Sequence, residues 1–66
     1  MDVAMLKKKL GERGLNVETL ATKVGIDRST MYRKLNGSVS TTICEAQKIK
    51  DALGLTNDEA RSIFFG

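Results

Sequence analysis

The stretch VETLATKVGIDRSTMYRKLN, residues 17–36, decides the fold of this chain. Leu20, Ala21 and Val24 lie three and four positions apart, so they share one face of a helix that we expect over 17–24. Gly25 then interrupts the pattern, because glycine readily adopts the positive φ that a tight turn requires. The small side chain of Ala21 leaves room for a second helix to cross closely over the first.

The residues after the turn have the signature of that second helix. Asp27 is a good N-cap residue, and Met31 and Leu35 supply an apolar stripe for a helix over 28–36. Two short helices joined at an angle by a glycine turn form a helix-turn-helix. The stretch therefore predicts this motif.

The outward face of the second helix carries side chains that suit DNA. At about 100° per residue, Ser29 and Arg33 lie on the side opposite Met31, with Tyr32 beside them and Arg28 in the first turn. Arginine can pair with guanine through two hydrogen bonds, and serine and tyrosine can reach bases or phosphates. The alternative interpretation is a solvated polar face on an amphipathic helix.

Residues 15–37, LNVETLATKVGIDRSTMYRKLNG, resemble the helix-turn-helix of phage repressors and Cro-like regulators, the lambda-repressor-like DNA-binding domain family. The resemblance extends over nearly the whole chain and implies an all-α fold, a compact bundle of five short helices in a single domain over 1–66. It also implies a sequence-specific transcriptional regulator of a phage or prophage that binds double-stranded DNA, with the helix over 28–36 in the major groove. The matching positions are Leu20, Ala21, Val24, Gly25, Ile26, Arg28, Ser29, Thr30, Met31, Arg33, Asn36 and Gly37.

The resemblance assigns two kinds of DNA contact to this chain. In the family, the residues that match Arg28, Ser29, Tyr32 and Arg33 face the bases. Candidate phosphate contacts surround them, at the ends of the motif helices and in the polar loop that follows, where hydroxyls and free backbone N–H groups are expected. These candidates are Asn16, Lys34, Asn36, Ser38, Ser40 and Thr41.

Two positions depart from the family. Val17 stands where a phosphate-binding glutamine is common, and Lys34 stands where isoleucine or leucine often points inward. We expect Leu35 to take that core role, which keeps Lys34 among the candidate phosphate contacts.

The composition excludes several classes of function. Among 66 residues there is no histidine and one cysteine, so a zinc site or a histidine-based catalytic triad lacks its residues. We expect no enzymatic activity, no metal and no cofactor. A lone cysteine fits a reducing compartment, and Cys44, next to Ile43, is expected to be a small apolar packing residue. No long apolar run or signal peptide is apparent, so we expect a cytoplasmic protein without membrane contact.

Positive charge is concentrated in the half that contains the motif. Residues 7–34 include eight basic and three acidic side chains, whereas residues 35–66 include three basic and four acidic ones. This asymmetry is expected if the first half faces a polyanion. Lysines, Arg13 and loop donors would then supply salt-dependent affinity. For the run of lysines at 7–9, a solvated face is the alternative.

Two of the remaining helices are predicted from apolar spacing. One spans 2–13, with Gly14 after its end. The other spans about 41–53, with Ser40 or Thr41 as its cap. Their inward residues are expected to be Val3, Leu6 and Leu10 in the first, and Ile43, Ala46, Ile49 and Leu53 in the second.

A capping box at residues 56–59 predicts the start of a fifth helix. Phe64 and Phe65 would be about 100° apart on this helix, so they cannot both be central in one small core. We expect Phe65 to be the exposed ring. Two explanations stay open: a homodimer contact, or packing of both rings across the end of the bundle. A dimer on a pseudo-palindromic operator would read enough bases to be selective.

The alternative function is a protein-interaction module on the same scaffold, of the antitoxin or anti-repressor type. The salt dependence of binding distinguishes this module from a DNA-binding regulator, because the affinity for DNA at several phosphates falls by orders of magnitude as the salt concentration rises. A protein partner on Phe64 and Phe65 would be less sensitive. The N-terminal domain of a longer repressor is a third interpretation, with the same chemistry and a weaker dimer.

Overall fold

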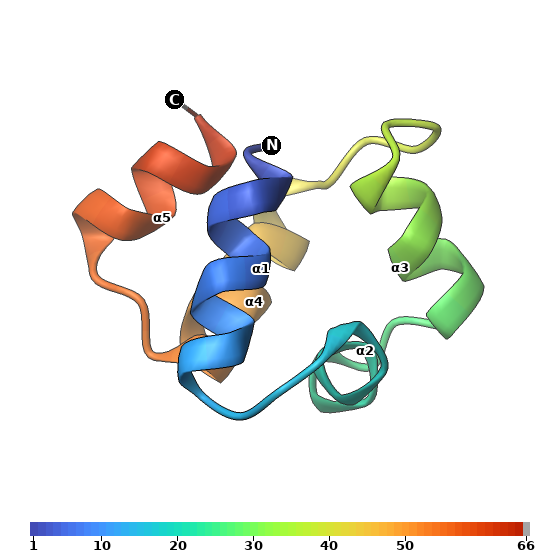
Figure 1. Cartoon of the computed structure of the whole chain (residues 1–66). Helices are drawn as coiled ribbons and strands as arrows, with labels where there is room; N and C mark the ends of the chain where they lie inside the picture. Colours follow the sequence, from blue (N-terminus) through green and yellow to red (C-terminus); the bar gives the residue numbers. More distant parts are fainter. Residues whose placement is uncertain (66) are drawn as a thin grey trace.

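The computed structural model describes residues 1–65, which form five α-helices joined by short loops (Figure 1). They are α1 (Val3–Glu12), α2 (Val17–Val24), α3 (Arg28–Leu35), α4 (Ile43–Leu53) and α5 (Asn57–Phe64). No strand occurs within residues 1–65, so the prediction of an all-α, five-helix bundle is confirmed. In the same range, no helix is long and apolar enough to cross a membrane.

The helices are arranged so that α3 stands at one edge of the bundle. Figure 1 shows α1 in front of α4, with α5 on one side of this pair and α2 and α3 on the other. α2 contacts α1, α3 and α4, whereas α5 contacts α1 and α4. The beginning and the end of the described chain meet beside α5, where the Asp2 amide donates to the Ile63 carbonyl at 2.6 Å.

The core draws one large, fully buried side chain from each helix. In chain order these side chains are Leu6, Leu20, Met31, Ile49 and Ile63. Each helix therefore contributes an anchor to a single apolar cluster, and burial of such side chains stabilises a fold by about 1.5–3 kcal/mol each. Because Met31 is one of the anchors, the inner face of α3 is fixed and its opposite face is directed outward.

The turn between α2 and α3 is closed by a glycine in the left-handed region. Gly25 has φ +71°, and the Ile26 amide donates to the Ala21 carbonyl at 3.0 Å. Ile26 packs against the core as it leaves the turn. The equivalent bond closes α1 and α4, from the amides of Leu15 and Leu55. A glycine followed by an apolar residue thus reverses the chain at three helix ends in the described range.

The N-caps of α3 and α5 lie where the sequence predicted them, and α2 is capped by Asn16, which precedes the predicted helix over 17–24. Asp27 caps α3 and Thr56 caps α5 through the predicted capping box. α4 differs, because its N-cap is Thr42 and not Ser40 or Thr41.

The late start of α4 changes which of its side chains point inward. Thr42 forms a capping box with Glu45, so Ile43 becomes the first helical residue and its side chain is 78% exposed. Cys44 is exposed as well. The predictions that Ile43 joins the core and that Cys44 is a packing residue are therefore wrong. The buried stripe of α4 begins at Ala46.

Two basic residues connect α1 to the other helices of the bundle: Lys9, which is in α1, and Arg13, which is its C-cap. Lys9 Nζ lies 2.5 Å from Glu59 Oε2 in α5, and this hydrogen bond, with one from the Thr56 amide, lowers the pKa of Glu59 to about 2. Arg13 Nε donates to the Leu53 carbonyl at the end of α4, at 2.6 Å. Lys9 and Arg13 therefore satisfy partners within the protein, and the expectation that Arg13 supplies attraction for DNA does not fit.

We expect the substitution Gly25→Ala to lower the free energy of unfolding by about 1–2 kcal/mol, because a Cβ is strained at positive φ. An added Cβ would meet no atom within 4 Å at this position, so the cost is that of the backbone alone. Gly11 is the matched control, since it lies inside α1 and also faces open space. Gly11→Ala should raise stability by about 0.5–1 kcal/mol. Urea unfolding measures both, and equal effects of the two substitutions would contradict the role of the turn.

Candidate nucleic-acid interface

The outward face of α3 presents the side chains that the sequence placed there. Ser29 and Arg33 are exposed on the side away from the buried Met31, and Tyr32 is about half exposed beside them. Arg28, in the first turn, projects freely, with 67% of its side chain exposed. The four candidate base-reading residues therefore lie together on one uncovered surface, which we call the α3 face.

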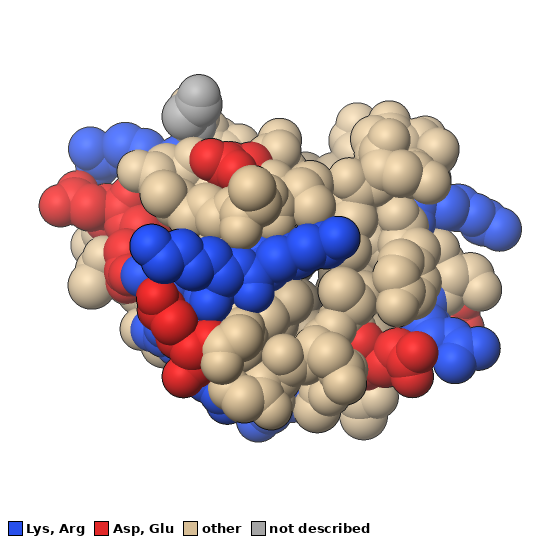
Figure 2. Space-filling view, viewed as in Figure 1, with Lys and Arg blue, Asp and Glu red and all other residues tan. Residues whose placement is uncertain are grey.

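The charge of the α3 face is more balanced than the composition indicated. Figure 2 shows basic side chains projecting along the edge of the molecule where α3 lies, with acidic atoms next to one of them. Arg28 Nη1 lies 3.6 Å from Glu18 Oε2, which comes from the first turn of α2. Asp27 adds a second carboxylate. Two arginines and two carboxylates thus share this face, so their formal charges cancel.

Asp27 stabilises the start of α3. Its Oδ2 accepts a hydrogen bond from the Ser29 amide at 2.9 Å. A carboxylate at a helix N-terminus is favoured by the helix dipole, which supports the capping role predicted for this residue.

Lys34 is turned into the protein, contrary to expectation. Its Nζ donates to Glu45 Oε1 at 2.8 Å and to the Ser40 carbonyl at 3.0 Å, and only 4% of its side chain is exposed. Leu35 is only partly buried, so Lys34 and not Leu35 follows Met31 on the inner stripe. The prediction of a phosphate contact from Lys34 does not fit this position.

The pair formed by Lys34 and Glu45 joins α3 to the start of α4. Glu45 also accepts a hydrogen bond from the Thr42 amide at 2.9 Å. The hydrogen bond from Lys34, followed by that from Thr42, holds the pKa of this carboxyl below its usual value of 4.5. A charge buried in the protein needs such a partner, so the ion pair connects the end of α3 to the start of α4.

The loop after α3 offers fewer phosphate donors than expected. The amides of Gly37, Ser38 and Val39 all donate to carbonyl oxygens at the end of α3. The Ser38 amide is shared with Asn36 Oδ1, which accepts it at 2.9 Å. The donors that stay free in this part of the chain include the hydroxyls of Ser38 and Ser40, which are exposed, and the side-chain nitrogen of Asn36. The backbone amides of Ser40 and Thr41 donate to no described residue.

The remaining phosphate candidates differ from each other in accessibility. Asn16 is exposed, and although its Oδ1 accepts from the amide and hydroxyl of Thr19, its side-chain nitrogen donates to no described residue. Thr41 is unsuitable, because its Oγ1 is buried and has no hydrogen-bond partner in the described residues. Val17, which replaces the family's glutamine, packs against the core.

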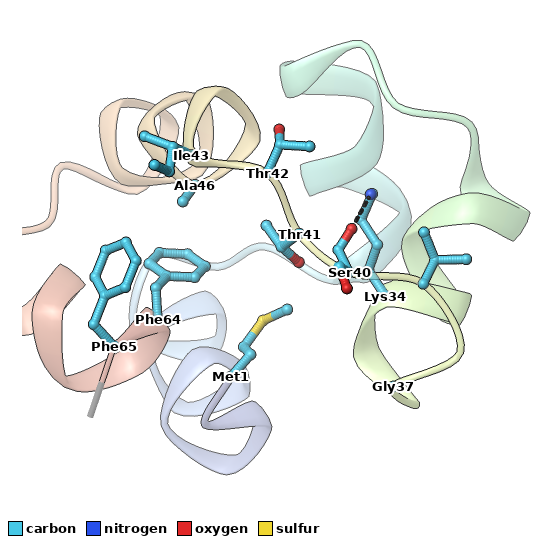
Figure 3. A pocket seen from close by; sticks show the side chains of 11 residues that line it. Met1, Lys34, Gly37, Ser40, Thr41, Thr42, Ile43, Ala46, Phe64 and Phe65 are labelled. Carbon is cyan, nitrogen blue, oxygen red and sulfur yellow. Dashed lines mark hydrogen bonds between the residues drawn. The ribbon is translucent and has the colours of Figure 1, made fainter.

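A second feature is a hollow with both polar and apolar lining residues, between the loop after α3 and the end of α5. The hollow has a volume of about 280 Å³ and lies beside four exposed apolar residues: Met1, Val39, Ile43 and Phe65. Figure 3 shows the rings of Phe64 and Phe65 next to each other on one wall, with Phe64 pointing toward Thr41. Phe65 is 69% exposed, as predicted, whereas Phe64 is partly buried.

Sequence reasoning missed two of these features for different reasons. The Thr42–Glu45 spacing is a capping-box signature that would have set the start of α4 and left Ile43 outside. The approach of Glu18 to Arg28 has no such local signal, since it depends on the angle at which α2 and α3 cross.

The fold and the α3 face define a DNA-binding domain of the helix-turn-helix (HTH) class. The model of the Cro/C1-type HTH DNA-binding domain family matches residues 5–60, from α1 into α5. The chain belongs to this family. Neither a curated protein nor a solved structure matches the chain.

We expect Lys34→Met to lower the free energy of unfolding by about 1–3 kcal/mol at pH 7, because the methylene packing is retained while Glu45 loses its cation. The pair stabilises the fold above the usual pKa of Glu45, and its contribution is lost as the pH falls through the lowered value. The deficit of Lys34→Met should therefore shrink below about pH 4.5. Urea unfolding of the wild type and the variant, at pH 7 and again below about pH 4.5, measures the deficit. Lys48→Met, at an exposed position of α4, is the control and should be nearly neutral.

Proposed function

We propose that this protein is a sequence-specific transcriptional regulator of the repressor or Cro type, from a phage or prophage, that binds a double-stranded operator as a homodimer in the cytoplasm. Its membership of a DNA-binding HTH family supports the general part of the proposal. The observation that carries the specific part is the α3 face, on which Arg28, Ser29, Tyr32 and Arg33 are exposed together.

The dimensions of α3 suit the major groove. The groove of B-DNA is about 12 Å wide and admits one α-helix, and its base edges distinguish all four base pairs. Arg33 is in the last turn of α3 and has no ion pair with any described residue, so its fork of donors is available to guanine. Phosphate contacts from Asn16, Asn36, Ser38 and Ser40 would hold the helix in register.

The exposed apolar side chains around the hollow support dimerisation of the regulator. Exposed Ile43, Phe65, Val39 and Met1 surround a concave surface in a chain of only 66 residues. A two-fold dimer uses the same patch on both subunits, so the exposed ring of Phe65 on each subunit can pack into the hollow of the other. Dimers of the helix-turn-helix class place their two recognition helices on half-sites about 34–36 Å apart, and we expect the same spacing for this dimer.

Selection of bound sites from a random duplex pool tests the proposal and supplies the operator. On the selected duplex, Arg33→Ala should weaken binding by about 1–3 kcal/mol and relax the preference at one base position. Arg61→Ala, which removes an exposed arginine from α5, is the matched control and should leave that preference unchanged. A pool without enriched sequences, or affinity that is insensitive to salt, would contradict the regulator and favour a protein-interaction module.

The dimer is tested by placing a charge beside the hollow. Ile43→Lys should raise the dimer dissociation constant at least about tenfold, because a lysine there would be desolvated in the interface. Cys44→Lys is the matched control, since Cys44 is also exposed at the start of α4 but does not line the hollow. Sedimentation equilibrium and binding to the full and half operator measure the effects. Equal dissociation constants for the two variants would place the dimer contact elsewhere.

A further inference from the structure

The α3 face carries a carboxylate whose position in the first turn of a helix suits the helix dipole but which does not favour phosphate binding. Glu18 lies in the first turn of α2, and 58% of its side chain is exposed. Its carboxylate forms one ion pair within the described residues, with Arg28 at the start of α3. A negative charge at this place repels the phosphates that a DNA-binding face has to approach.

The geometry of the pair leaves the arginine available to DNA. The 3.6 Å between Arg28 Nη1 and Glu18 Oε2 is longer than a good charge-assisted hydrogen bond. The guanidinium of Arg28 makes no hydrogen bond to any residue in the range 1–65, so its five donors can still pair with a ligand. Glu18 therefore attracts the guanidinium of Arg28 toward α2, while the N–H donors of the guanidinium stay free.

We propose that Glu18 is a specificity-determining residue that positions Arg28 for guanine and opposes its capture by phosphate. This inference rests on the proposed function, since it assumes that α3 reads an operator. The edge of guanine presents two neutral acceptors, N7 and O6, whereas a phosphate carries a full negative charge. The carboxylate of Glu18 is therefore repelled more strongly by a phosphate than by a guanine edge at the same distance.

The carboxylate of Asp27 also repels phosphate, but it does not take the place of Glu18. Asp27 is held by its hydrogen bond to the Ser29 amide, so its position is fixed by the helix cap. Glu18 has no such bond from its carboxylate to the backbone within the described residues. Removing the charge of Glu18 therefore tests selectivity and leaves the N-cap of α3 intact, whereas changing Asp27 would remove that cap.

Glu18→Gln is the test, because it removes the charge and keeps the shape. Binding is measured on the selected operator and on a scrambled duplex of the same length, over a series of salt concentrations. The affinity for the scrambled duplex should rise by about two- to fivefold, and the ratio of operator to scrambled affinity should fall by a similar factor. The slope of log affinity against log salt should steepen by up to about 0.9.

Arg28→Ala identifies the base position that Arg28 reads, and the double variant tests whether Glu18 acts through it. Glu18→Gln should relax the preference at that position, and it should have no further effect on the preference when Arg28 is alanine. The urea midpoint of each variant shows that the effects do not come from loss of folding.

Asp51→Asn is the control for net charge, because Asp51 is exposed on α4 and its carboxylate accepts only from Gln47 in the described chain. If Glu18→Gln and Asp51→Asn change both duplexes by the same factor, the proposed role of Glu18 is refuted while the regulator stands. If the wild type does not distinguish operator from scrambled duplex, both proposals are refuted, since there is no selectivity for Glu18 to set.

Discussion

The ion pair between Lys34 and Glu45 is the constraint on which the position of the recognition helix depends. α3 stands at the edge of the bundle and packs on α2, so its far side has no helix behind it. Met31 anchors the middle of α3 in the core, and Lys34 fixes its last turn to the first turn of α4 and to the following loop. A buried ammonium is tolerated only because Glu45 and the Ser40 carbonyl satisfy it together. This arrangement keeps the opposite side of α3 free and gives it one orientation.

The distribution of charge in the sequence is a poor guide to the charge of the binding face. Eight basic residues lie between positions 7 and 34, yet Lys9, Arg13 and Lys34 use their charges to join helices within the bundle. On the α3 face, two arginines meet two carboxylates. Sequence-independent attraction for DNA comes from cations that neutralise phosphates, so under the proposed function the α3 face itself would add little of it. Its contribution would then be hydrogen bonds to base edges, while phosphate contacts come from the residues around it.

Local sequence rules predicted most of the fold, and long-range contacts explain what they missed. The turn at Gly25, the caps Asn16, Asp27 and Thr56, and the exposure of Ser29, Arg33 and Phe65 follow from spacing and capping within a few residues. The start of α4 was also encoded locally, in Thr42 and Glu45, but the neighbouring threonines hid it. The inward turn of Lys34 was not local, because its partner is eleven residues further along the chain. The same holds for Arg13, whose acceptor, the Leu53 carbonyl, is forty residues away.

The loop after α3 connects the two surfaces on which the proposed function depends. Its amides from Gly37 to Val39 donate to the end of α3, so the loop continues the helix as a rigid extension and is not a flexible linker. One side of this loop adjoins the α3 face, and the other side lines the hollow together with Ile43 and Phe65. A second copy seated in that hollow would therefore fix the separation of two recognition helices through a few rigid residues. Such a separation is set by geometry and not by affinity, so an operator with altered half-site spacing would be rejected even if both half-sites were intact.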